Sequence, residues 1–339
     1  MDSEYIAFVR DIAEQQVDPQ QRAANISNYK AIRARQWGVD SLPPSKILDL
    51  VDQDPEMAHT RYLQEFIYDP IVKLLPPADQ EKLASASIVA LPNRSVNGCS
   101  LLCPNGEPLI VIDSGLLSLV SFWYERKAEV QRLSKIKPLS DIVEFNATTY
   151  NFLLDNYRSQ GTYGYLPPST ETPETLLGWA MLMTTAAEMF VVLHEIGHII
   201  AGHLATSPAN AFRLFPSDKP EAAASPAINI YEHPWQAEYQ ADGIAWLAYQ
   251  NLWPRHETFA KLAGGSAPIL PKQSPLHFFE YMALIETNIP PSGAVPTHPP
   301  AAGRLNMLVR VTQQLLKDAE LANWGAEILE TASHMPRMN

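Results

Sequence analysis

The sequence predicts an α+β protein that is mostly α-helical. Apolar residues recur at helical spacing over most of the chain, β-prone runs are confined to 85–113, and no internal repeat or low-complexity tract points to a solenoid. The 339 residues exceed the size at which one hydrophobic core usually stops growing. We therefore assign 1–84 to an N-terminal helical region and 85–339 to the main domain.

The first elements are expected to be helices followed by a small sheet. Apolar residues at helical spacing predict helices over 3–15 and 56–75, the second interrupted at Pro70. Short β-prone runs predict two strands, at 87–91 and 108–112, with Asn-Gly turns between them. These strands make up the small sheet.

Helical patterns dominate the remainder of the chain. Thr172, Pro173 and Glu174 supply a cap, a proline at the first helical position and an early acid, which together start a long helix. The loop that follows is longer than most connections in compact domains, which is typical of a functional or mobile segment. In order, we expect helices over 114–133, 139–157, 173–205, 234–252 and 301–321, a loop over 206–233, and proline-rich segments over 264–275 and 288–300.

The long helix contains an apolar run that resembles a membrane span in length. Residues 176–193 are apolar or small except for Glu188. A span placed here would carry this acid inside and several ionisable groups, among them His194 and Glu195, at one end. We therefore expect a buried core helix and no membrane partner.

The composition fits a folded protein with a large core. Hydrophobic residues make up 46% of the chain and charged residues 18%, below the usual charged share of about 25%. With 25 Lys and Arg against 37 Asp and Glu, the net charge is −12, which disfavours phosphate backbones and anionic membrane surfaces. Nucleic acid is therefore not expected as a partner.

Cysteine usage and the amino terminus bear on the compartment. Cys99 and Cys103 cannot supply a disulfide framework or a four-thiolate metal site. Their spacing leaves open a thiolate that blocks a metal, but buried structural thiols are the simpler interpretation. The first residues, Met1 to Glu4, lack the basic start and apolar run of a secretory signal. We expect a reducing compartment and place the protein in the cytoplasm.

The most informative motif is His194-Glu195-Ile196-Gly197-His198, inside the long helix. Helix positions four apart lie on one face, so both imidazoles can point at one metal while Glu195 can reach a water on that metal. A tetrahedral catalytic zinc needs a third protein ligand and keeps its fourth position for water. The motif therefore supplies only part of a site.

The third ligand is expected from further along the chain. In a continuous helix, His203 would point about 180° away from His194, and we interpret it as a helix-end histidine with a structural hydrogen bond. Glu238 and Asp242 share one face of the 234–252 helix. This spacing suits Glu238 as the ligand and Asp242 as the acceptor of a ring N–H that fixes a histidine tautomer. The alternative is an ordinary solvated acidic pair.

The combination of His194-Glu195-x-x-His198 with Glu238-x-x-x-Asp242 resembles the gluzincin metallopeptidases. The resemblance implies a zincin-like metallopeptidase core that binds one Zn²⁺ ion. It implies further that His194, His198 and Glu238 bind this ion. Glu195 is then the general base, and Asp242 orients a histidine.

One more segment narrows the resemblance. Thr297-His298-Pro299-Pro300, followed by Arg304, is similar to the Thr-His-Pro segment and following arginine of the prenyl-protein protease and heat-shock membrane protease family. The match covers roughly residues 176–304. Those relatives are often membrane-embedded, whereas this chain shows no credible span and its first 115 residues match none of them. The membrane substrate class is therefore not carried over.

These residue types imply peptide hydrolysis by a metal-activated water. Zinc lowers the pKa of its bound water toward 7 and polarises the scissile carbonyl, while Glu195 takes the water proton and passes it to the leaving amine. The oxyanion needs donors, and the candidates are His298, Tyr231 and Arg304. For His298 the alternative is a turn histidine that caps the next helix, and for Arg304 it is a salt bridge to an acid.

Glycines and a strand indicate where other segments approach the metal helix. Gly197 and Gly202 each cost about 1 kcal/mol relative to alanine within a helix, so we expect another helix or strand to pack closely there. Gluzincins generally bind substrate as an added strand along a sheet edge. The 108–112 segment is the expected edge, with a plain core role as the alternative.

The main hypothesis is a cytoplasmic zinc-dependent endopeptidase that acts on a restricted set of protein or peptide substrates. The 206–233 loop and the 264–300 region would then form walls or a lid. A regulatory form, held inactive until a partner protein or signal arrives, is motivated by the unmatched amino-terminal helices. The alternative from another class is a non-catalytic zinc-stabilised protein-binding module. Glu195 argues against it, because a structural site needs no base.

Overall fold

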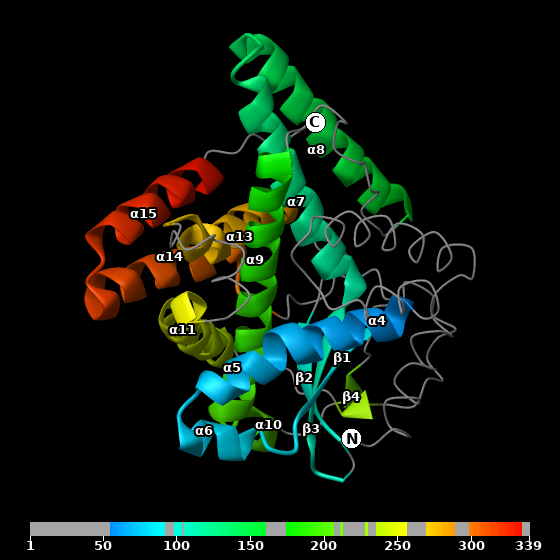
Figure 1. The fold of residues 1–339 in the computed structure, drawn as a ribbon, viewed down its shortest axis with the longest axis vertical. Helices are drawn as coiled ribbons and strands as arrows, with labels where there is room; N and C mark the ends of the chain where they lie inside the picture. Colours follow the sequence, from blue (N-terminus) through cyan, green and yellow to red (C-terminus); the bar gives the residue numbers. More distant parts are fainter. Residues whose placement is uncertain are drawn as a thin grey trace.

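A computed structural model describes residues 55–91, 98–103, 105–160, 174–206, 211–212, 228–229, 235–255, 269–288 and 298–333. The helix expected over 3–15, most of the 206–233 loop and the segment 289–297 lie outside the described residues. Within them the chain is mostly helical and contains a small mixed sheet (Figure 1). The predicted fold class, α+β and mostly α, is confirmed.

The elements follow one another as a helical segment, a sheet and a long series of helices. The first half contains α4 (Pro55–Tyr62), the π-helical turn η1 (Leu63–Tyr68), α5 (Asp69–Leu74), α6 (Pro77–Lys82), β1 (Ser87–Leu91), β2 (Gly98–Leu102), β3 (Pro108–Asp113), α7 (Ser114–Leu133) and α8 (Leu139–Gln160). The second half contains α9 (Glu174–Ile200), α10 (His203–Thr206), β4 (Ala211–Phe212), β5 (Ile228–Asn229), α11 (Trp235–Leu252), the 3₁₀ turn η3 (Trp253–Arg255), α13 (Ile269–Asn288), α14 (Ala301–Val311), the π-helical turn η4 (Thr312–Leu316) and α15 (Ala319–Ser333).

The main sheet has the strand order β1-β3-β2. β1 pairs in parallel with β3, and β2 pairs antiparallel with β3. β1 and β3 coincide with the two predicted runs, whereas β2 was not predicted because Asn97-Gly98 indicates a turn. Since β3 is the central strand, the expectation that 108–112 forms the sheet edge is wrong. Among the described residues, β2 is the edge strand that lies against α9.

Helix α9 is the central element of the fold (Figure 1). It packs most extensively against α11 and α7, and also against α13. Its sequence is apolar on all sides, which is typical of a helix buried all round. Among the described residues, only Gly178–Ile200 is long and apolar enough to cross a membrane, and this stretch is buried inside the protein. Its burial agrees with the predicted core helix.

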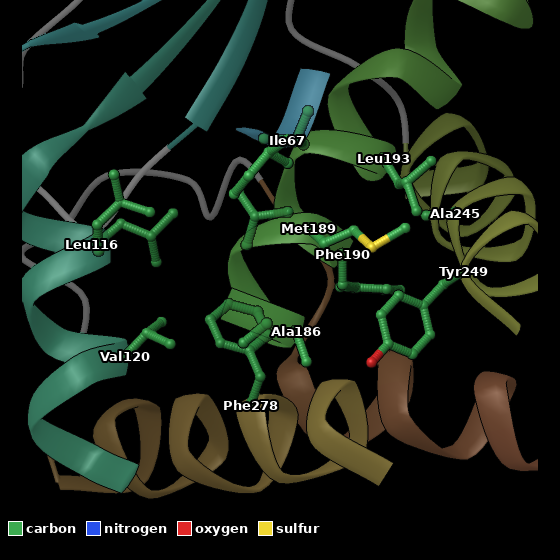
Figure 2. Packing of buried hydrophobic residues seen from close by; sticks show 14 of the residues in the cluster. Ile67, Leu116, Val120, Ala186, Met189, Phe190, Leu193, Ala245, Tyr249 and Phe278 are labelled. Carbon is green, nitrogen blue, oxygen red and sulfur yellow. The ribbon is translucent and has the colours of Figure 1, made fainter. Parts of the chain in front are cut away.

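The hydrophobic core surrounds α9. The Phe190 ring meets Tyr249 of α11 and Phe279 of α13 edge to face, with ring centroids 6.4 and 5.6 Å apart. Figure 2 shows Leu116 and Val120 of α7 on one side of α9 and Tyr249 of α11 on the other. Buried side chains from three helices therefore fix the position of α9.

Residues 55–84 contribute to this same core. Leu63, Ile67 and Ile71 are fully buried and belong to the cluster that contains the α9 side chains. The Tyr62 hydroxyl donates a hydrogen bond of 3.0 Å to Glu188, the buried acid of α9. Within the described residues, the boundary predicted between 84 and 85 thus crosses a continuous core.

The C-terminal helices differ from the sequence prediction. The single helix expected over 301–321 is divided: α14 passes into η4, and α15 begins at Ala319. The physical reason is Lys317, whose φ of 54° lies in the left-handed region and turns the chain. Residues 269–275, expected to be loop because of their prolines, form the start of α13. Here Ser274 is held in the core by a 2.7 Å hydrogen bond to the Met183 carbonyl.

Candidate metal centre

Two histidines and one glutamate from two helices meet in the interior. His194 and His198 lie one turn apart on α9, and Glu238 lies in the first turn of α11. Their ligand atoms all lie within 4.8 Å of one another, and all three residues are buried. The two Nε2 atoms are 3.2 Å apart, and the Glu238 carboxylate lies 3.3 Å from His194 Nε2 and 3.5 Å from His198 Nε2. This group could hold a metal ion.

The chemistry of the group fits a metal ion. Glu238 Oε2 is buried and forms no hydrogen bond of good geometry among the described residues, although it lies 3.3 Å from His194 Nε2 and 3.4 Å from His298 Nε2. An ionised oxygen buried in this way is costly unless a cation approaches it. Two imidazole nitrogens and one carboxylate oxygen are also the donor set of many catalytic zinc sites. These three side chains therefore fit the zinc ion that the sequence resemblance implies.

Close packing of α11 on α9 brings the three residues together. A Cβ atom at Gly197 would lie 3.0 Å from the Ala241 carbonyl oxygen and 3.2 Å from Ala241 Cα. The two backbones therefore touch at Gly197, which confirms the expected close approach. Gly202 has a different role: nothing lies within 4 Å of its would-be Cβ, and its φ of 74° turns the chain after α9.

Gly197→Ala is expected to destabilise the protein by about 1–3 kcal/mol and to weaken zinc binding. The added methyl group meets backbone rather than a flexible side chain, so α11 must shift and take Glu238 with it. Gly243→Ala is the matched control, because nothing lies within 4 Å of a Cβ there and helix propensity favours alanine by up to about 1 kcal/mol. Urea unfolding and zinc titration measure both variants. Equal gains in stability would show that the contact at Gly197 is not tight.

Asp242 and Arg304 lie behind His194. His194 Nδ1 is 2.9 Å from Asp242 Oδ1. Arg304 donates to the same carboxylate through Nε at 2.7 Å and Nη2 at 2.6 Å, a bidentate pair with fully buried Asp242. A carboxylate only accepts, so His194 donates from Nδ1 and leaves Nε2 for a metal. For Arg304 the sequence left open an oxyanion contact or a salt bridge to an acid, and the structure shows the salt bridge, to Asp242.

His203 lies behind the second histidine. Its Nδ1 is 2.8 Å from His198 Nδ1, and its Nε2 is 3.2 Å from Gln240 Oε1. The prediction of a helix-end histidine with a structural hydrogen bond is therefore confirmed. The expected direction, about 180° away from His194, is wrong because it assumed a continuous helix. In the structure α9 ends at Ile200, and the turn at Gly202 brings His203 back toward the histidine pair. His203 is not among the three residues that face the metal position.

Glu195 is held against the sheet edge. Ser100 of β2 donates a 2.7 Å hydrogen bond to Glu195 Oε2, and its Oγ lies 3.0 Å from the Glu195 carbonyl oxygen. A Cβ atom at Gly98 would lie 3.1 Å from Glu195 Oε1, so this carboxylate packs closely against the backbone of β2. The sequence pattern did not identify Ser100 or Gly98, since it gave no sign that β2 exists.

Burial and neighbouring charges set the protonation of these groups. Burial raises the pKa of Glu195 to about 7, although His194 and the Ser100 hydrogen bond oppose it. Burial also opposes ionisation of Glu238, but His298 and His194 outweigh it and lower its pKa to about 2. Burial disfavours the cationic form of His194, but Asp242 outweighs it and raises its pKa to about 10. A metal ion must displace that proton, so binding releases it.

A pocket opens beside the centre. Its volume is about 230 Å³, and His194 and Glu195 form part of its wall. The remaining wall residues are mostly apolar and come from several elements: Gly98, Leu116, Phe190, Val191, Phe278, Phe279, Met282, Glu286, His298, Ala301 and Arg304. Leu116, Phe190 and Phe278 appear in Figure 2. The pocket thus joins the candidate metal position to an apolar surface.

The structure describes some of the remaining residues singled out in the sequence, but not all of them. His298 lies on the pocket wall, with Nε2 3.4 Å from Glu238 Oε2. Tyr231 and Thr297 lie outside the described residues. Cys103 is buried and Cys99 partly buried, and neither forms a disulfide among the described residues. Burial raises the pKa of Cys99, and Glu195 adds to this effect, which disfavours a thiolate near the centre.

Comparison with protein-family models, with curated proteins and with solved structures gives no significant match.

Proposed function

We propose that the protein is a zinc-dependent endopeptidase with a zincin-like core, as its resemblance to the gluzincins implies. The observation that carries the proposal is the placement of Glu195. Glu195 lines the same open pocket as His194, and its carboxylate interacts electrostatically with His194 and Glu238 of the buried two-histidine, one-glutamate group. A site that only braced the fold would need neither a second acid beside the donor set nor a pocket leading to it.

Zinc held by His194, His198 and Glu238 would supply a Lewis acid and a water of lowered pKa. Glu195 takes the proton of the attacking water and delivers it to the leaving amine. Burial raises the pKa of Glu195 and so makes its carboxylate a better proton acceptor. Ser100 holds the Glu195 carboxylate in one orientation throughout.

The substrate binds between β2 and the pocket. β2 is the edge strand nearest to Glu195, so a peptide can extend the sheet there through main-chain hydrogen bonds. His298, another residue of the pocket wall, is the candidate donor to the carbonyl oxygen as it gains negative charge. Arg304 lines the pocket as well, but its guanidinium is paired with Asp242.

The pocket selects a bulky apolar side chain next to the scissile bond. A cavity of about 150 Å³ lined by Leu, Ile and Phe accepts benzene, so 230 Å³ is enough for an aromatic or branched side chain. Phe278, Phe279 and Met282 of α13 supply apolar contacts to it. An apolar wall of this kind restricts the protein substrates to those with such a side chain next to the scissile bond. The cytoplasmic location and the regulatory partner are proposed from the sequence alone.

The test is cleavage of a mixed peptide library by zinc-loaded protein, read by mass spectrometry of new termini. We expect internal cuts that stop when a chelator removes zinc, resume when zinc is restored, and fall next to bulky apolar residues. Cuts confined to the amino-terminal residue would indicate an aminopeptidase. No zinc-dependent cut in the library, or in cells that express the protein, would favour a zinc-stabilised binding module instead.

A further inference from the structure

We propose that His203 and Gln240 act as positioning residues that fix the tautomer of His198, keeping its Nε2 free for the metal. The inference rests on the proposed metal site. It concerns His198, whose Nδ1 lies 2.8 Å from His203 Nδ1.

The geometry places four polar atoms in a chain. Gln240 Oε1 lies 3.2 Å from His203 Nε2, and His203 Nδ1 lies 2.8 Å from His198 Nδ1. The chain joins three elements, α11, α10 and α9. It starts on the exposed side of α11 at Gln240 and ends at buried His198.

The direction of the protons follows from the Gln240 end. An amide oxygen only accepts, so His203 donates from Nε2. A neutral imidazole carries one ring proton, so His203 Nδ1 is then an acceptor. His198 must donate to it from Nδ1, which leaves the lone pair of His198 on Nε2. That atom is 3.5 Å from the Glu238 carboxylate and faces the metal position.

The two metal-facing histidines are therefore oriented in different ways. Asp242 accepts the His194 proton as a buried carboxylate paired with Arg304. His198 Nδ1 instead contacts His203, which in turn contacts the exposed Gln240. Partners that orient a metal-binding histidine typically change metal affinity by about 10- to 100-fold when removed. We expect the His203 contact to fall in this range.

The test measures tautomers directly in zinc-free protein at pH 8, using long-range ¹H–¹⁵N spectra of ¹⁵N-histidine-labelled chain. In wild type, His198 is expected to carry its proton on Nδ1. His203→Ala should remove this single form and weaken zinc binding about 10- to 100-fold. His203→Gln, whose amide oxygen can accept the same proton, should restore much of both. A merely structural residue would not shift the tautomer.

Variants of Gln240, the exposed residue at one end of this chain of contacts, test the inference without altering the core. Gln240→Leu removes the final acceptor and should loosen the tautomer preference, whereas Gln240→Glu keeps an acceptor and should preserve it. Gln236→Leu is the matched control, since Gln236 is also an exposed glutamine of α11, one turn earlier. A proton on His198 Nε2 in wild type, or equal zinc affinity in His203→Ala and wild type, overturns the inference. If wild type binds no zinc, the proposed function fails, while the spectra still decide the tautomer.

Discussion

Glu195→Gln is expected to reduce kcat/KM about 10²- to 10⁴-fold while the protein keeps its zinc. The amide has the shape of the carboxylate but cannot take a proton from water. It can still accept the Ser100 hydrogen bond, so the local structure should remain. Steady-state kinetics on a library-derived peptide and metal analysis of the same sample measure the two properties together.

Glu286→Gln is the control for this experiment. Glu286 also lies on the pocket wall, but it accepts a hydrogen bond from the Ala301 backbone and does not belong to the candidate metal group. Its variant should retain most of the activity. Undiminished hydrolysis by Glu195→Gln would rule out the general-base role. Loss of zinc from that variant would show instead that Glu195 stabilises the site.

Asp242→Ala should lower the free energy of unfolding by about 3–5 kcal/mol. Asp242 is fully buried, and its removal leaves the Arg304 guanidinium in the core without its bidentate partner. Burial opposes ionisation of Asp242, but Arg304 outweighs it and lowers its pKa to about 2, so the pair is ionic at neutral pH. Zinc affinity should fall by about 10- to 100-fold as well, because His194 loses the acceptor of its Nδ1 proton.

Urea unfolding of zinc-free and zinc-loaded protein separates these two effects. Asp79→Ala provides the comparison, since Asp79 pairs with Lys82 at 3.9 Å on the exposed side of α6. Surface pairs of this kind contribute about 1 kcal/mol or less. If Asp242→Ala and Asp79→Ala lose similar stability, the buried pair with Arg304 does not hold the centre together.

The residues of the candidate metal group could be predicted because their spacing within each helix is a local property of the sequence. The spacing of His194 and His198 on one helix face, and of Glu238 and Asp242 on another, follows from helix geometry alone. The close approach of α11 to α9 also left a local sign, since Gly197 costs stability in a helix unless the space is needed. Both helices were predicted within a few residues of their observed ends.

Long-range contacts could not be predicted in this way. Ser100 and Glu195 are 95 positions apart in the sequence. Ser100 also lies on β2, which was not predicted because the Asn-Gly pair at its start is typical of a turn. The position of His203 depends on where α9 ends. Gly202, which has a positive φ, turns the chain there, so His203 does not point in the direction that a continuous helix predicts. The α13 wall of the pocket begins in a segment whose prolines indicate a loop, although packing against α9 and α14 keeps it helical.

X-ray absorption spectroscopy of the zinc-loaded wild-type protein tests the central claim most directly. The account predicts one zinc per chain, with two imidazoles and one carboxylate among its ligands, at the Zn–N and Zn–O distances of about 2.0–2.2 Å that such ligands give. A sulfur ligand at about 2.3 Å, a zinc without imidazole ligands, or a protein that binds no zinc would contradict it.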